Sequence, residues 1–144
     1  MRWKPTGEIE INVGVLGNSN DVLWEFRDFL VGLEAESNYR ISMMLAKDQE
    51  TILRVMSFIP EGFDIMIVTD CQPDYVYSEI TEKALKSNAE VRILYQINMD
   101  VEFADKLYPH ILYVSDRERI KILIEEKINH LIAERIAKEE KQDE

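Results

Sequence analysis

The feature that most constrains the fold is a regular alternation of short apolar runs with amphipathic helical patterns. Runs of this kind predict buried strands, and apolar residues spaced three and four apart predict helices. The expected strands are Glu8–Leu16, Tyr39–Leu45, Phe63–Val68, Val91–Ile97 and Ile111–Val114. The expected helices are Asp21–Leu33, Gln49–Ile59, Pro73–Lys86, Val101–Leu107 and Arg117 to about Lys141.

Five strands that alternate with five helices predict a parallel sheet covered by helices on both faces. Right-handed crossovers then favour the strand order 2-1-3-4-5. The 144 residues suffice for a single domain with a full core. We therefore expect one three-layer, doubly wound α/β domain over residues 1–144, with flavodoxin-like or P-loop-like topology.

The expected last helix is unusually long. At 1.5 Å per residue it would reach roughly 37 Å, which exceeds what a five-stranded sheet can cover. Its final segment, Ala137–Glu144, is polar and should form a helical tail that frays or projects. The tail is either a solvated end or a helix that pairs with a partner. The apolar stripe expected to face the sheet consists of Ile120, Leu123, Ile124, Ile128, Leu131, Ile132 and Ile136.

The net charge of -11 lies almost entirely before Arg117. Such an acidic body argues against nucleic acid and against anionic membranes, and it favours either solubility or a basic protein partner. No apolar run approaches the roughly 18 residues of a membrane span. The N-terminus does not resemble a signal peptide, and a single cysteine cannot form an internal disulfide, so we expect a cytoplasmic protein.

Metal and dinucleotide sites are not indicated. His110, His130 and Cys71 are isolated from one another in the sequence, whereas metal sites need clustered ligands. The glycine fingerprint GxGxxG of dinucleotide-binding proteins is absent. The sequence therefore predicts neither a metal site nor a cofactor.

In a sheet of the expected order, ligands bind at the carboxyl ends of the first and third strands. Here these ends are the segments Gly17–Asn20 and Thr69–Cys71. A phosphate-binding loop needs a glycine-rich backbone, a lysine and a serine or threonine. Gly14 and Gly17 are present, but no lysine or second glycine follows. The segment therefore indicates a tight turn from strand to helix.

Taken in order, the loops resemble those of a degenerate Ras-superfamily small GTPase. Gly17–Trp24 lies where that family has GxxxxGK[ST], and only Gly17 matches the motif. Val22 replaces the second glycine, Leu23 the lysine and Trp24 the magnesium-binding hydroxyl residue. The resemblance implies a pseudo-GTPase that does not hydrolyse nucleotide and acts as a binding scaffold.

Four further segments carry the same resemblance. Leu45–Glu50 is similar to the DxxGQE switch, and Phe63–Asp70 to the buried strand that ends in Asp. Ile97–Asp100 stands where NKxD reads guanine, and Ser115–Arg117 where SAK would be. The resemblance implies a vacated nucleotide site with the remnants Gly17, Asn18, Ser19, Asn20, Asp70, Asp100 and Ser115.

A response-regulator receiver is the alternative family. Val15–Leu30 and Tyr39–Pro73 are similar to its first two-thirds, and the phosphoacceptor would be Thr69 or, after a slip of one residue, Asp70. Receivers need acidic residues after the first strand, where this chain has Gly17 and Asn18. This resemblance implies a pseudo-receiver, again a module for interaction rather than catalysis.

An enzyme is the third interpretation. Thr69–Ala84 is similar to a helix of Toll/interleukin-receptor-like NAD hydrolases and nucleoside deoxyribosyltransferases. In that case Glu79 and Glu82, which share a helix face, would be the catalytic carboxylates. The simpler alternative is a solvated helix face shared with Lys83 and Lys86.

Trp24 falls outside the apolar stripe of the first helix, on a face shared with Arg27, Asp28 and Val31. A tryptophan on a polar face is a candidate anchor for a partner protein. It could instead cover the edge of the sheet or pack on Trp3. We expect a non-catalytic interaction or regulatory module, with Trp24, Arg27 and Val31 as candidate partner-binding residues. The partner's identity and the oligomeric state stay open.

Overall fold

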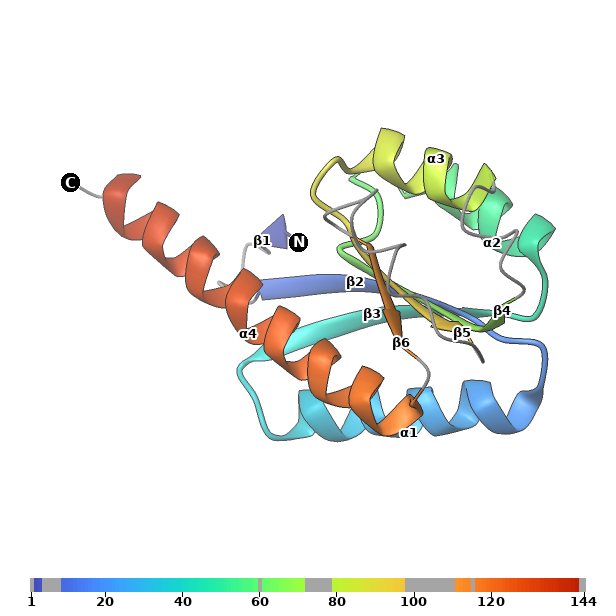
Figure 1. Cartoon of the computed structure of the whole chain (residues 1–144). Coiled ribbons are helices and arrows are strands. Elements are labelled where there is room, and N and C mark those ends of the chain that lie inside the picture. Colours follow the sequence, from blue (N-terminus) through green and yellow to red (C-terminus); the bar gives the residue numbers. More distant parts are fainter. Residues whose placement is uncertain are drawn as a thin grey trace.

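The computed structural model of the chain describes residues 2–3, 9–59, 61–71, 79–97, 111–114 and 116–142. The strands are β1 (Arg2–Trp3), β2 (Ile9–Leu16), β3 (Tyr39–Ala46), β4 (Ile65–Cys71), β5 (Arg92–Ile97) and β6 (Ile111–Val114). The helices are α1 (Asn20–Ala35), α2 (Gln49–Met56), α3 (Glu79–Ser87) and α4 (Arg117–Gln142) (Figure 1). The helix expected at Val101–Leu107 and the first part of the one expected at Pro73–Lys86 lie outside the described residues.

The central sheet is parallel and has the order β3-β2-β4-β5-β6. This is the predicted order 2-1-3-4-5, so the fold class is confirmed. A sixth strand, β1, was not expected: it pairs antiparallel with the start of β2, through Trp3 and Ile9. Because β4 pairs with β2 only from Val13 onward, the first residues of β2 are open to β1 on that side.

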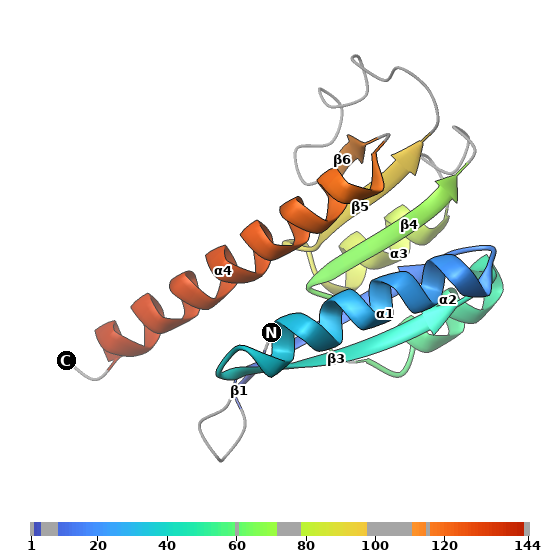
Figure 2. The same ribbon diagram turned by 90° about the horizontal axis from the view of Figure 1, so that it is seen from below.

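Helices cover both faces of the sheet and enclose two cores (Figures 1 and 2). Alternate residues of β4 separate the cores: Ile65 and Ile67 pack toward α1 and α4, and Met66 packs toward α2 and α3. All three of these side chains are fully buried. The apolar run at 63–68 therefore serves two cores at once, as its composition suggested.

The helix boundaries follow local capping. Ser19 caps α1, and Asp48 caps α2 by accepting a hydrogen bond from the Thr51 amide at 2.7 Å. Hydrogen bonds from the side chain of Thr51 and, to a lesser extent, from its amide lower the pKa of Asp48. The expected end of α2 at Ile59 is wrong, because the amides of Ser57 and Phe58 bond three residues back and close the helix in a tighter turn.

The C-terminal helix α4 extends beyond the end of the sheet, as its length suggested. Its 26 residues extend about 39 Å. Ile120, Ile124 and Ile128 are fully buried, but Ile136 is 44% exposed. The prediction that Ile136 continues the inward stripe is wrong, since the helix has passed the end of the sheet at that level (Figure 2). The polar end stays helical to Gln142.

Candidate functional site at the carboxyl edge of the sheet

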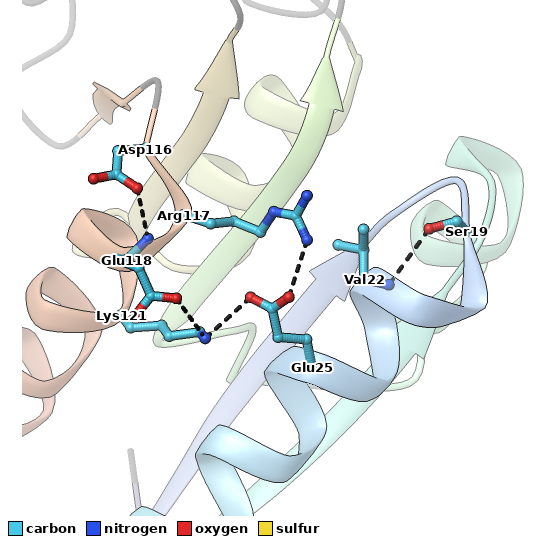
Figure 3. A network of polar contacts seen from close by, with 7 residues as sticks. All are labelled: Ser19, Val22, Glu25, Asp116, Arg117, Glu118 and Lys121. Atoms are coloured by element: carbon cyan, nitrogen blue, oxygen red, sulfur yellow. Dashed lines mark hydrogen bonds and ion pairs between the residues drawn. The ribbon is translucent and has the colours of Figure 1, made fainter.

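The crevice where such folds bind ligands begins at the turn between β2 and α1. Ser19 has extended backbone, and its hydroxyl accepts a hydrogen bond from the Val22 amide at 3.4 Å (Figure 3). The carbonyl of Ser19 accepts from the Leu23 amide at 3.3 Å. The Val22 amide, one of the open amides at the start of α1 that could serve a bound anion, is thus directed to Ser19, whereas the Leu23 amide makes the first regular hydrogen bond of the helix.

Gly17 is closed in by its neighbours. A Cβ atom at Gly17 would lie 2.8 Å from the Thr69 hydroxyl and 3.3 Å from Cδ2 of Leu23. The buried Thr69 hydroxyl donates to the Leu16 carbonyl at 3.1 Å, and the Gly17 amide donates to the Ala46 carbonyl at 3.0 Å. The ends of β2, β3 and β4 are therefore tied together by the protein's own groups, and glycine is required here by close approach.

The three positions at which phosphate-binding chemistry would be expected have other roles. Val22 and Leu23 are 5% and 6% exposed and belong to the core under α1 and α4. Leu23, in the lysine position of the GTPase resemblance, contributes an apolar side chain beside Gly17. Trp24, in the hydroxyl position, points outward and is 49% exposed.

The other predicted remnants are only partly placed. Asn18 is exposed in the turn that precedes α1, and Asn20, also exposed, is the first residue of that helix. Asp70 lies in β4, and Asp100 and Ser115 lie outside the described residues. Thr69, one of the two phosphoacceptor candidates, is buried and engaged with Leu16, which leaves its hydroxyl turned into the fold.

Gln96, near the end of β5, is a polar residue that the sequence analysis missed. It is 6% exposed, and its side-chain carbonyl oxygen has no hydrogen-bond partner among the described residues. Gln96 interrupts the apolar run at 93–97, and this interruption was the available signal.

A pair of hydrogen bonds joins β2 to the residue before β4 at the opposite edge of the sheet, where the parallel strands begin. The buried Asp64 carboxylate accepts from the Asn12 amide at 2.8 Å, and the Asp64 amide donates to the Asn12 carbonyl at the same distance. Asp64 also lines a pocket of about 190 Å³ against α4. This pair occupies the amino edge, away from the ends of the strands where ligands bind in such folds.

Trp24 presents its ring on the outer surface of α1. The Arg27 guanidinium lies 4.1 Å from the ring centroid, a cation–π contact, and pairs with Asp28 at 3.2 Å. Val31, one further turn along, is 50% exposed. The three predicted partner-binding residues therefore share one exposed patch, here called the α1 patch (Trp24, Arg27 and Val31). Trp24 does not pack into the core.

Glu79 and Glu82 lie on the exposed side of α3. Lys83 turns toward α2, where its ammonium donates to the Leu53 carbonyl and to the Ser57 hydroxyl, both at 2.7 Å. A hollow of about 820 Å³ passes over this surface. Residues 72–78 of the segment Thr69–Ala84, on which the enzyme interpretation rests, lie outside the described residues.

An ion-pair cluster, the α1–α4 clamp, joins two helices that are far apart in the sequence (Figure 3). The Glu25 carboxylate contacts Arg117 and Lys121, each at 3.0 Å, and Lys121 also contacts Glu118 at 3.1 Å. Burial opposes the charge of Lys121, but hydrogen bonds to the two carboxylates outweigh this, and the pKa of Lys121 is raised above 10.5. Sequence patterns contain no signal for a contact over such a separation.

Within the described ranges, no group of three or more His, Cys, Asp or Glu residues could hold a metal ion. His130 is exposed and pairs with Glu134 on α4 at 2.8 Å. His110 lies outside the described residues. Of the described helices, none has both the length and the apolar character that a membrane crossing requires.

Comparison with known proteins identifies a shared fold. No protein-family profile matches the sequence, and no curated protein is significantly similar to it. A crystal structure of a protein provisionally named pilus assembly-related, from Burkholderia pseudomallei K96243, superposes with a TM-score of 0.51 and 11% identity. The match covers 81% of this chain and 88% of the other. At this identity the likeness concerns the fold alone.

The crowding at Gly17 gives a first prediction. Gly17→Ala should lower the free energy of unfolding by roughly 1–3 kcal/mol, because the new methyl group meets Thr69 and Leu23. Gly32→Ala is the matched control: on the exposed side of α1, nothing lies within 4 Å of the place its new methyl group would take, so it should raise stability by roughly 0.5–1 kcal/mol. Urea unfolding measures both. An equal effect of the two substitutions would contradict the crowding.

The clamp gives a second prediction, on pH. Glu25→Gln should cost roughly 1 kcal/mol at neutral pH. Part of this loss in the free energy of unfolding comes from the contact with Lys121, whose pKa is raised in the folded state. That part is present below pH 10.5 and is lost as pH rises through the folded-state pKa. Urea unfolding of wild type and variant across that range measures the change.

Glu50→Gln is the control for the clamp, because the Glu50–Arg54 pair is solvent-exposed and lies within one helix. We expect it to change stability only slightly at any pH. A Glu25→Gln effect that stays constant to high pH would show that Lys121 does not take part.

Proposed function

We propose that this chain is a non-catalytic, cytoplasmic interaction module that binds a protein partner through helix surfaces rather than a small ligand at the carboxyl edge of its sheet. The observation that carries the proposal is the closure around Gly17. Thr69 and Leu23 crowd Gly17, and hydrogen bonds tie the ends of β2, β3 and β4 to one another. No lysine in Gly17–Trp24 could offset the charge of a phosphate. The acidic balance of the chain favours a partner with a basic surface.

The α1 patch is the proposed contact. Trp24 offers a large ring, half of which is already out of solvent, and Arg27 holds it from one side. Aromatic and arginine side chains supply most of the binding energy at many protein interfaces. Val31 extends the apolar surface along the same helix. None of the three side chains fills the core, so all three are available for contact with a partner protein.

A receiver-like signalling domain without phosphorylation is the second candidate. The observation that favours it over a pseudo-GTPase is the short link Glu36–Asn38, which joins α1 directly to β3. A Ras-type fold has its first switch and an antiparallel strand at this point, and the link has no room for them. Flavodoxin-like receivers have the strand order 2-1-3-4-5 without any insertion.

The vacated site gives a third prediction. Calorimetric titration with GTP, GDP and NAD, each with and without Mg²⁺, should give no saturable heat, because Gly17–Trp24 lacks the lysine of a phosphate-binding loop and Thr69 and Leu23 crowd Gly17. Micromolar binding of any of them would overturn the proposal. Loss of NAD in a turnover assay that Glu82→Ala abolishes, and that Glu50→Ala does not, would instead support the enzyme interpretation.

The α1 patch gives a fourth prediction. Trp24→Ala should leave the melting temperature nearly unchanged, since the ring is half exposed, and should sharply reduce the protein recovered with the immobilised chain from lysate. Phe58→Ala is the control, because Phe58 is an aromatic residue 78% exposed in the turn after α2, away from α1.

Two results would contradict this assignment. A large loss of stability in Trp24→Ala would mean that the ring supports the fold. Equal loss of captured protein in Trp24→Ala and Phe58→Ala would mean that the partner does not select the α1 patch.

A further inference from the structure

The exposed side of α3 has a charge order that is complementary to itself. Its ionisable residues are Glu79, Glu82, Lys83 and Lys86, at positions i, i+3, i+4 and i+7. Residues with this spacing lie along one side of a helix. Two acids therefore occupy the amino-terminal half of this side and two bases the carboxyl-terminal half. A second copy of the helix that runs in the opposite direction presents the order base, base, acid, acid. Each charge of one copy then faces an opposite charge of the other.

Such an order fits a two-fold axis. When two copies of α3 run antiparallel with the axis between Glu82 and Lys83, Glu79 of each copy lies opposite Lys86 of the other. Glu82 of each copy then lies opposite Lys83. An isologous interface requires a surface that is complementary to its own copy under a two-fold rotation, and this arrangement of charges meets that requirement.

We propose that the chain forms a homodimer in which α3 packs antiparallel on α3 of a second copy, with Glu79 of each copy paired to Lys86 of the other.

The fixed position of Lys83 supports the pairing. Its ammonium is held by Leu53 and Ser57 of α2, so its charge is fixed on the α2 side of α3, at the middle of the helix where the proposed axis crosses it. Glu79, Glu82 and Lys86 are exposed and free to reach across. A lysine already ordered within its own chain loses less side-chain entropy when the dimer forms.

The hollow over α3 provides surface for the second helix. It measures about 820 Å³, and it is lined by Leu53 of α2 and by Leu85 as well as by the four charged residues. Both leucines are only partly buried in the core beneath. The contact therefore combines charge pairs with apolar surface that is still exposed to water in one copy.

The charge of the molecule also favours this face. The chain carries -11 overall, and two copies repel each other at most orientations. The exposed side of α3 holds two acidic and two basic residues and is neutral. By contrast, α1 carries Asp21, Glu25, Asp28 and Glu34 against Arg27 alone. A contact through α3 therefore brings together two surfaces that each carry no net charge.

The test is a charge exchange followed by sedimentation equilibrium. Wild type should dimerise. Glu79→Lys and Lys86→Glu should each weaken the dimer about tenfold or more, because two attractive contacts become repulsive. The double variant Glu79→Lys/Lys86→Glu should restore wild-type affinity, since every pair is again of opposite sign. A mixture of the two single variants should form a heterodimer tighter than either homodimer.

Glu50→Lys, on α2, is the control: it changes the net charge by the same amount as Glu79→Lys and should leave dimerisation unchanged. Circular dichroism melting verifies that each variant folds, as expected for exposed positions. A wild type that stays monomeric at all concentrations would overturn the proposal. So would a dimer that the single variants do not weaken, or a double variant no tighter than the single ones.

Discussion

The need to cover both faces of a parallel sheet governs this structure. Neighbouring residues of β4 point into different cores, with Ile65 and Ile67 on one side and Met66 on the other, and all are withdrawn from water. A sheet of this kind is stable only with helices on each face, which requires a crossover between every pair of consecutive strands. Every parallel strand then ends at the same edge. The fold therefore creates one edge at which ligand chemistry is usually placed, whether or not the chain uses it.

In this chain the edge is used for packing. Thr69 closes over Gly17 and ties β4 to the end of β2, while Leu23 packs an apolar side chain beside Gly17. The segment Gly17–Trp24 contains no lysine that could offset the charge of a phosphate. The contacts proposed above lie instead on outer helix surfaces: the α1 patch on one face of the sheet and the charged side of α3 on the other. The two surfaces lie on different layers, so a dimer through α3 leaves the α1 patch accessible.

Sequence patterns located most of the elements because their signals are local. Residues 111–114 form β6 and Arg117 begins α4 as the apolar run and the helical spacing indicate. The predictions from sequence are wrong where contact with a distant segment determines the local structure. β1 forms only because the start of β2 has an open side, and Ile136 is exposed only because α4 passes the end of the sheet at that level. The early end of α2 depends on a tight turn that apolar periodicity does not record.

The sequence by itself determined the layered α/β architecture, the lack of a lysine after Gly17 and the self-complementary order of charges on α3. Each of these depends on residues within one or two helical turns or within one strand. Only the tertiary structure decided that Thr69 closes over Gly17, that Gln96 is buried, and that Glu25 joins Arg117 and Lys121. These contacts join residues far apart in the chain, and their geometry follows from how helices and strands pack on one another rather than from any local pattern of residue types.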